Sequence, residues 1–138
     1  MAIAKRLWDA KRVEKEWGTE YWLTNSQKYC AKLLVMKGGY AGSLHRHYEK
    51  DETLTVVKGE MRLHIQGGVF GIDSKTMGEG DWVRLAPGDW HRLEGLADET
   101  WIMEASTHHD DMDVERATVS GKLRREMAEA AAEPGDDD

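Results

Sequence analysis

Short segments with a two-residue hydrophobic repeat recur along this chain, and turn residues separate them. The segment Glu52–Lys58 is rich in β-branched residues and places Glu52, Leu54 and Val56 on one face. Met61–Ile65 alternates apolar and polar residues in the same way. Other strands are expected at residues 21–24, 29–36, 43–47, 69–74, 81–85, 91–93 and 100–106. Roughly eight to ten short strands with little helix predict an antiparallel sandwich, jelly roll or barrel.

The two ends of the chain differ in composition from this strand-rich centre. Residues 5–17 are densely charged and are compatible with a short helix or an arm. Residues 121–132 have the composition of a short helix, and the acidic residues after it predict a disordered end. We therefore expect a single domain over residues 1–120, with an N-terminal arm at 1–16 and a tail at 121–138.

Length, charge and cysteine content narrow the class of protein. A chain of 138 residues is long enough for one domain with a real core. The formal net charge of −7 argues against nucleic acid as a partner, and the single cysteine, Cys30, excludes an internal disulfide framework. No apolar run approaches the roughly 20 residues of a membrane helix, and the N-terminus is too charged for a signal peptide. A cytoplasmic location without membrane contact is the expectation.

Candidate metal ligands are concentrated in the stretch Gly39–Gly59. On a strand, His45 and His47 point to the same face, and Glu52 follows shortly afterwards. A fourth candidate, His91, lies much further along the chain. Imidazole and carboxylate groups suit divalent ions such as Zn, Mn, Fe, Co or Ni. The stretch therefore predicts a site for one divalent metal ion.

The same stretch resembles the first motif of the cupin superfamily. Gly39, His45, His47, Glu52 and Gly59 occupy every defined position of that motif, which is a glycine, His-x-His, a glutamate and a second glycine at set spacings. The resemblance implies a double-stranded β-helix, or jelly-roll barrel, that carries one metal ion.

The second cupin motif is matched at its ligand position. Gly80, Gly88 and His91 stand at the expected spacing. Ala86 replaces the family's proline and Gly95 replaces its asparagine, and neither change removes a ligand. The two motifs together imply a metal site made by His45, His47, Glu52 and His91.

The flanking segments resemble the cupin sugar isomerases, which include type II phosphomannose isomerases and D-lyxose isomerases. Histidine at position 45, where the phosphomannose type often has glutamine, places the match nearer to lyxose-isomerase-like or short stand-alone cupins. This resemblance extends over about residues 14–117 and rests on these residues: Lys15–Glu20, Tyr29, Lys32, Ser43, Leu44, Lys50, Glu104–Thr107 and Asp111–Arg116.

The resemblance implies a metal-dependent interconversion of an aldose and a ketose, free or phosphorylated, through an enediol. Four protein ligands on an octahedral ion leave two neighbouring positions, which suit the two oxygens of a hydroxy-aldehyde or hydroxy-ketone. Glu104 is the predicted base, and Lys50 is predicted to stabilise the enediolate or bind an oxyanion. Arg92 and Trp90, beside His91, are predicted to contact the sugar. The implied partners are a small sugar or sugar phosphate and a second copy in a homodimer.

Other interpretations of these residues stay open at this stage. Glu104 is compatible with a structural role, paired with Arg116 or Lys32, and Lys50 with a surface ion pair to a neighbouring carboxylate. His108 and His109 fit either a ligand contact or a solvated loop. The metal motif is shared by cupin dioxygenases, and a protein that binds metal and sugar without turnover would need the same ligands.

Overall fold

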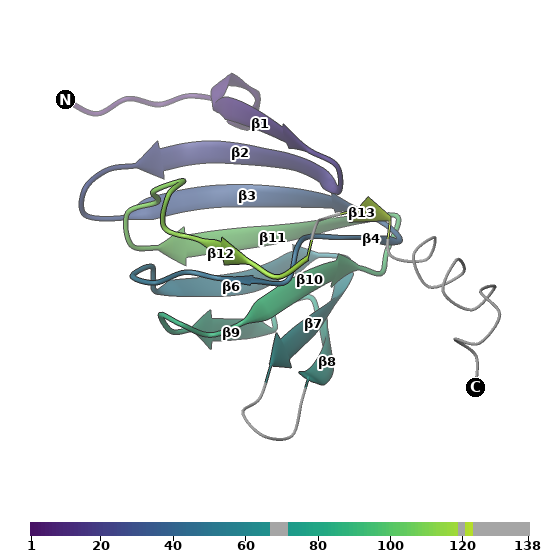
Figure 1. Ribbon diagram of the computed structural model, residues 1–138. Coiled ribbons are helices and arrows are strands. Elements are labelled where there is room, and N and C mark those ends of the chain that lie inside the picture. Colours follow the sequence, from purple (N-terminus) through teal and green to yellow (C-terminus); the bar gives the residue numbers. More distant parts are fainter. Residues whose placement is uncertain (67–71, 119–120, 123–138) are drawn as a thin grey trace, which may run out of the picture.

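Figure 1 shows the computed structural model of the chain, which describes residues 1–66, 72–118 and 121–122. Six antiparallel strands form the first sheet, in the order β1-β2-β3-β11-β6-β9. Long neighbouring strands in this sheet come from distant parts of the sequence, since β11 lies between β3 and β6. The bounds are Lys11–Lys15 for β1, Gly18–Asn25 for β2, Cys30–Lys37 for β3, Glu99–Ser106 for β11, Glu52–Lys58 for β6 and Trp82–Leu85 for β9.

The second sheet has the order β12-β5-β10-β4-β13, with β7 paired to β10 and β8 paired to β7. Figure 1 shows the β7–β8 hairpin projecting from one end of the molecule. The two antiparallel sheets confirm the predicted jelly-roll fold. The bounds are Glu115–Arg116 for β12, His45–Arg46 for β5, His91–Gly95 for β10, Tyr40–Ala41 for β4, Gly121–Lys122 for β13, Glu60–Gln66 for β7 and Ile72–Gly78 for β8.

Alternating side chains fill the space between the sheets. In β6 the residues Glu52, Leu54 and Val56 are buried while their neighbours are more exposed, as the two-residue repeat predicts. In β7, Met61 and Leu63 are buried in the same way. The described core is a single apolar cluster made by Trp17, Leu34, Met36, Leu54, Val56, Met61, Leu63, Met77, Leu85, Leu93 and Ile102.

One strand extends further along the sequence than predicted. The sequence predicts a strand over residues 69–74, but β8 continues through Met77 to Gly78. Met77 is only 2% exposed and pairs in register with Met61, so its burial in the core extends the strand. Because the residues before Met77 are polar, the sequence pattern did not indicate that Met77 lies in the core. Residues 69–71 of the predicted strand lie outside the described residues.

The predicted N-terminal arm contains a strand. After a 3₁₀ turn at Leu7–Asp9, β1 pairs along its whole length with β2, from Lys11 opposite Trp22 to Lys15 opposite Gly18. Its charged sequence suits an edge strand.

Most of the predicted tail cannot be compared with the structure. At its start, Gly121–Lys122 forms β13 against β4. The predicted helix beyond Lys122 and the acidic end lie outside the described residues. No helix in the described part of the chain has the length and hydropathy of a membrane span.

A segment after β11 crosses back to the strand that carries the first histidines. We call residues 107–118 the strap. Within it, β12 pairs with β5, and the Ala117 amide donates to the carbonyl of Leu44 at 2.8 Å. At its other end, the Thr107 amide donates to the carbonyl of Asp51 at 3.0 Å. The strap therefore flanks the whole segment from Leu44 to Asp51.

Candidate metal centre

Three histidines gather at one point inside the barrel. His45 lies on β5, His47 follows that strand, and His91 begins β10, where it is the register partner of His45. One ring nitrogen from each can be chosen so that all three lie within 4.8 Å of one another. His47 and His91 are buried and His45 is half-buried. The antiparallel pairing of β5 with β10 therefore brings the histidines of the first motif next to the histidine of the second motif.

The second ring nitrogen of each histidine is already occupied. Each Nδ1 lies within hydrogen-bond distance of a backbone carbonyl oxygen, which can only accept, so each Nδ1 carries the proton. The Nε2 atom then keeps its lone pair for a ligand, an arrangement typical of metal-binding histidines. The distances to the carbonyls are 2.8 Å from His45 to Ser43, 2.6 Å from His47 to Asp113 and 2.9 Å from His91 to Asp89.

Glu52 completes the cluster with a carboxylate. Its Oε2 lies 3.4 Å from Nε2 of His47, and its Oε1 lies 4.0 Å from Nε2 of His91. The side chain is 5% exposed. Within the described part of the chain, Oε2 is a buried atom with no hydrogen-bond partner. A buried oxygen without a donor, beside three imidazole nitrogens, fits a divalent cation.

The protonation states suit the same role. Burial lowers the pKa of His45 to about 3 and that of His47 to about 4, and it also lowers the pKa of His91. All three rings are therefore neutral near pH 7, the form that binds a metal. Burial, and secondly the charge of Glu104, raises the pKa of Glu52 to about 8, so a proton occupies this carboxylate in the metal-free protein.

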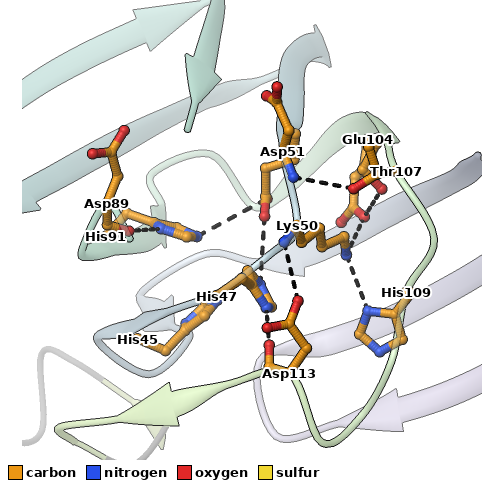
Figure 2. Close-up of polar contacts among 12 residues, drawn as sticks. His45, His47, Lys50, Asp51, Asp89, His91, Glu104, Thr107, His109 and Asp113 are labelled. Carbon is orange, nitrogen blue, oxygen red and sulfur yellow. Dashed lines mark hydrogen bonds and ion pairs between the residues drawn. The ribbon is translucent and has the colours of Figure 1, made fainter. Parts of the chain in front are cut away.

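A buried ion pair lies next to the histidines. Nζ of Lys50 is 2.6 Å from Oε2 of Glu104, and the two residues are 3% and 5% exposed (Figure 2). Ser106 donates a second hydrogen bond to the same oxygen at 2.9 Å. Burial opposes ionisation of Glu104, but the charges of Lys50 and Lys32 outweigh it and lower the pKa. The interpretation of Lys50 as a surface residue is therefore wrong.

The strap adds His109, for which the sequence left a ligand contact and a solvated loop open. His109 accepts a hydrogen bond at Nδ1 from Nζ of Lys50, at 3.0 Å (Figure 2). Its Nε2 then carries the proton and donates to Oδ1 of Asp111 at 2.8 Å. The side-chain amide of Asn25 holds the His109 backbone through both its N–H and its carbonyl. Since His109 lines the site, the solvated-loop interpretation is wrong for it. The pair of histidines at 108 and 109 in a polar segment was the sequence feature that indicated a ligand contact.

The histidines, Glu52 and the Lys50–Glu104 pair open onto one cavity of about 740 Å³. Its far wall comes from β1, β2 and β3, on which Trp22 and Lys32 face the space. Charges of both signs line it, including Lys11, Lys32, Lys50, Glu20, Glu104 and Asp111. Such a lining suits a polar ligand that offers both hydrogen-bond donors and acceptors.

Two residues predicted to contact a sugar lie elsewhere. Nε of Arg92 donates to the carbonyl of Gly42 at 2.8 Å. The guanidinium of Arg46 lies over the ring of Trp90, 5.0 Å from its centroid. Neither Arg92 nor Trp90 lines the cavity, so their contact with substrate stays a prediction without a structural contact behind it.

Comparison with known structures finds the same fold in larger proteins. Oxalate decarboxylase from Bacillus subtilis superposes with a TM-score of 0.71 and 16% sequence identity, over 80% of this chain and 31% of that chain. CapF from Staphylococcus aureus, a capsular polysaccharide assembling protein, gives 0.70 and 18%, over 80% and 32%. Identities this low show the fold alone, and the chain spans about a third of each neighbour.

Comparison by sequence identifies the family directly. No curated protein matches the chain. Residues 32–111 match the family model described as the cupin domain. This range is more than half of the chain and contains the four clustered residues His45, His47, Glu52 and His91. The chain therefore belongs to the cupin domain family, with three histidines placed to hold a metal ion.

Proposed function

We propose that this cupin is a metal-dependent aldose–ketose isomerase for a small free or phosphorylated sugar. The observation that carries the proposal is the position of Glu104. This buried carboxylate lines the same cavity as the histidines and Glu52. We expect the carbon next to the substrate carbonyl to lie in that cavity, within reach of Glu104. Proton transfer at such a carbon needs a positioned general base, and a carboxylate can fill that role.

The lining of the cavity supports a sugar as the ligand. Both cationic and anionic side chains line it, so a ligand with many hydroxyl groups finds both donors and acceptors. An apolar ligand would cover these polar side chains without offering them hydrogen bonds, which is costly. One structural neighbour, CapF, is described as a capsular polysaccharide assembling protein, which is consistent with carbohydrate as the ligand class.

The residues divide the reaction between them. A bound divalent ion would polarise the substrate carbonyl and acidify the neighbouring C–H bond. Glu104 would take that proton and return it to the adjoining carbon, while the hydroxyl proton passes from one substrate oxygen to the other through the enediol, so that no net proton is consumed. Lys50, 2.6 Å from Glu104, would donate to the substrate oxygen on which negative charge develops. The residues that would hold the ion are His45, His47, Glu52 and His91.

The ion pair between Lys50 and Glu104 favours a second function, in which the protein binds metal and sugar without catalysis. Lys50 and Lys32 lower the pKa of Glu104, and a carboxylate stabilised in its ionised form is a weak base. In that case Glu104 only neutralises the two buried lysines. The protein would then bind metal and sugar without turning the sugar over.

Isotope exchange separates the two functions. The protein, loaded with Mn²⁺ or Zn²⁺, is incubated in deuterated buffer with pentoses, hexoses and hexose phosphates. We expect one sugar class to form its keto or aldo isomer with deuterium at C1 or C2. Glu104→Gln should reduce this turnover by about 10²-fold or more while the metal content stays unchanged. Glu99→Gln, at an exposed position on the same strand, is the matched control.

Each contrary result points to a specific alternative. Sugar binding without isomer or deuterium in any substrate would support the binding protein. Oxygen uptake by an iron-loaded form would indicate a cupin dioxygenase. Loss of metal from Glu104→Gln would show that Glu104 supports the metal site and is not its base.

A further inference from the structure

Asp113, on the strap, contacts the loop between two metal-ligand positions. Its Oδ1 accepts hydrogen bonds from the backbone amides of Tyr48 and Glu49, at 2.8 and 3.0 Å. Its Oδ2 accepts from the amide of Lys50 at 3.0 Å. Three successive N–H groups thus converge on one carboxylate, and bonds to an ionised acceptor are about twice as strong as neutral ones.

The backbone of the same residue contacts a candidate metal ligand. Nδ1 of His47 donates to the carbonyl oxygen of Asp113 at 2.6 Å (Figure 2). This hydrogen bond sets the tautomer and orients the ring, so that Nε2 faces the other ligands. One residue of the strap therefore contacts both His47 and the loop that carries Lys50.

We propose that Asp113 is a positioning residue that aligns the metal ligands with the Lys50–Glu104 pair. Its carboxylate fixes the backbone of residues 48–50, and the loop then has one conformation in which Nζ of Lys50 reaches Glu104. Its carbonyl fixes the ring of His47. The inference rests on the metal centre and on the ion pair, and it does not require sugar isomerisation.

The strap is anchored well enough to act as this support. The Asn25 amide donates to the His109 carbonyl at 3.0 Å and accepts from the His109 amide at 2.9 Å. The Asp113 amide donates to the carbonyl of Asp110 at 2.9 Å, which closes a turn just before the contact. On the other side, β12 pairs with β5. Asp113 therefore lies between two fixed points of the strap.

The test compares Asp113→Ala and Asp113→Asn with the unaltered protein. Metal affinity is measured by competition with a chromophoric chelator, ligand geometry by the visible spectrum of the Co²⁺ form, and loop protection by hydrogen exchange of amides 48–50. For Asp113→Ala we expect a loss of metal affinity of about 10- to 100-fold, a changed Co²⁺ spectrum and faster exchange. Asp113→Asn, which keeps one acceptor oxygen but no charge, should show a smaller loss in the same direction.

Asp81→Asn is the matched control. Its carboxylate accepts one backbone N–H, from Gly78 at 2.9 Å, in a turn outside the site. This variant should keep the metal affinity, the Co²⁺ spectrum and the exchange of amides 48–50 unchanged.

The inference is overturned if folded Asp113→Ala binds metal with the original affinity and spectrum, whatever its loop does. Unchanged exchange at amides 48–50 would overturn it equally. If the alanine variant does not fold, Asp113→Asn decides by the same measurements. None of these readouts involves a sugar, so a protein without isomerase activity would leave this result intact, and a failure here would leave the isomerase proposal untouched.

Discussion

Glu52 shows how a single residue is shaped by its surroundings. It begins β6, a strand whose inward residues are otherwise apolar, and its Oε2 has no donor within the described part of the chain. Burial makes the ionised form costly, so the metal-free protein keeps the carboxylate protonated near neutral pH. A divalent cation removes that cost by replacing the proton.

Proton release upon metal binding follows from this state. Since the pKa of Glu52 is about 8, a proton occupies it at pH 7, whereas His45 and His47 with pKa values of about 3 and 4 carry none at Nε2. Each ion bound at pH 7 should therefore release about one proton, and none well above pH 8. The apparent metal affinity should rise with pH up to about 8 and then level off.

Calorimetry in buffers of different ionisation enthalpy measures the protons released per ion. Glu52→Gln is the control, because its neutral amide has no proton to lose in this range, and it should also weaken metal binding. Release that is independent of pH, or that persists in Glu52→Gln, would contradict the assignment of the proton to Glu52.

At the scale of the elements, tight turns bring neighbouring strands into register. β6 and β7 are joined through Gly59 alone, which has a φ of +85°. A Cβ atom at this position would lie 2.7 Å from the carbonyl oxygen of Glu99 and 2.9 Å from Oγ1 of Thr100. Gly80 has a similar φ of +88°, but a Cβ there would meet no atom within 4 Å. A substitution at Gly80 therefore changes only the cost of the backbone conformation, whereas a substitution at Gly59 adds the cost of a steric contact.

Alanine substitutions at these positions should differ in cost. Gly80→Ala should lower the free energy of unfolding by about 1 kcal/mol, the cost of a left-handed conformation with a side chain. Gly59→Ala should lower it by about 3 kcal/mol, because the turn must also move away from the backbone of β11. Denaturant unfolding of the metal-free protein measures both. Equal losses of unfolding free energy would show that β11 moves away from the new side chain at no cost, and that only the left-handed backbone conformation is unfavourable.

At the scale of the whole molecule, one wall of the cavity comes from β1, a strand that carries none of the candidate metal ligands. Among the described strands, β1 pairs only with β2, at the end of the first sheet, and its residues Lys11, Val13 and Lys15 line the cavity. The core cluster contains no residue of β1. The edge strand is therefore expected to shape the ligand site without supporting the barrel.

Removal of residues 1–15 tests this division. We expect cooperative unfolding with a melting temperature lower by only a few degrees, since little apolar surface is lost. Metal affinity should stay within about twofold of the original, because no ligand and no partner of a ligand is removed. Removal of residues 1–6, which precede the 3₁₀ turn, is the control and should change neither value. Loss of cooperative unfolding would show that β1 is part of the fold's stable unit.

The sequence predicted the elements whose pattern is local. The two-residue repeat of Glu52–Lys58 correctly predicted β6 and its buried face of Glu52, Leu54 and Val56. The extension of β8 to Gly78 was missed, because only the pairing of Met77 with Met61 shows that a polar run ends in the core. Helical composition after Gly121 likewise did not reveal that Gly121–Lys122 pairs with β4.

By itself the sequence determined the inward face of strands with a clear two-residue repeat, such as β6 and β7, because side-chain alternation is a property of the chain. Its resemblance to the two cupin motifs identified the four residues that meet at the metal site. Only the tertiary structure decided the partners of the buried charges. Lys50 lies between surface-type neighbours in the sequence but pairs with Glu104 inside the barrel. Asp113 reaches His47 across 66 residues. Which charged side chain is buried, and which partner lies next to it, is set by long-range strand pairing and not by the local sequence pattern.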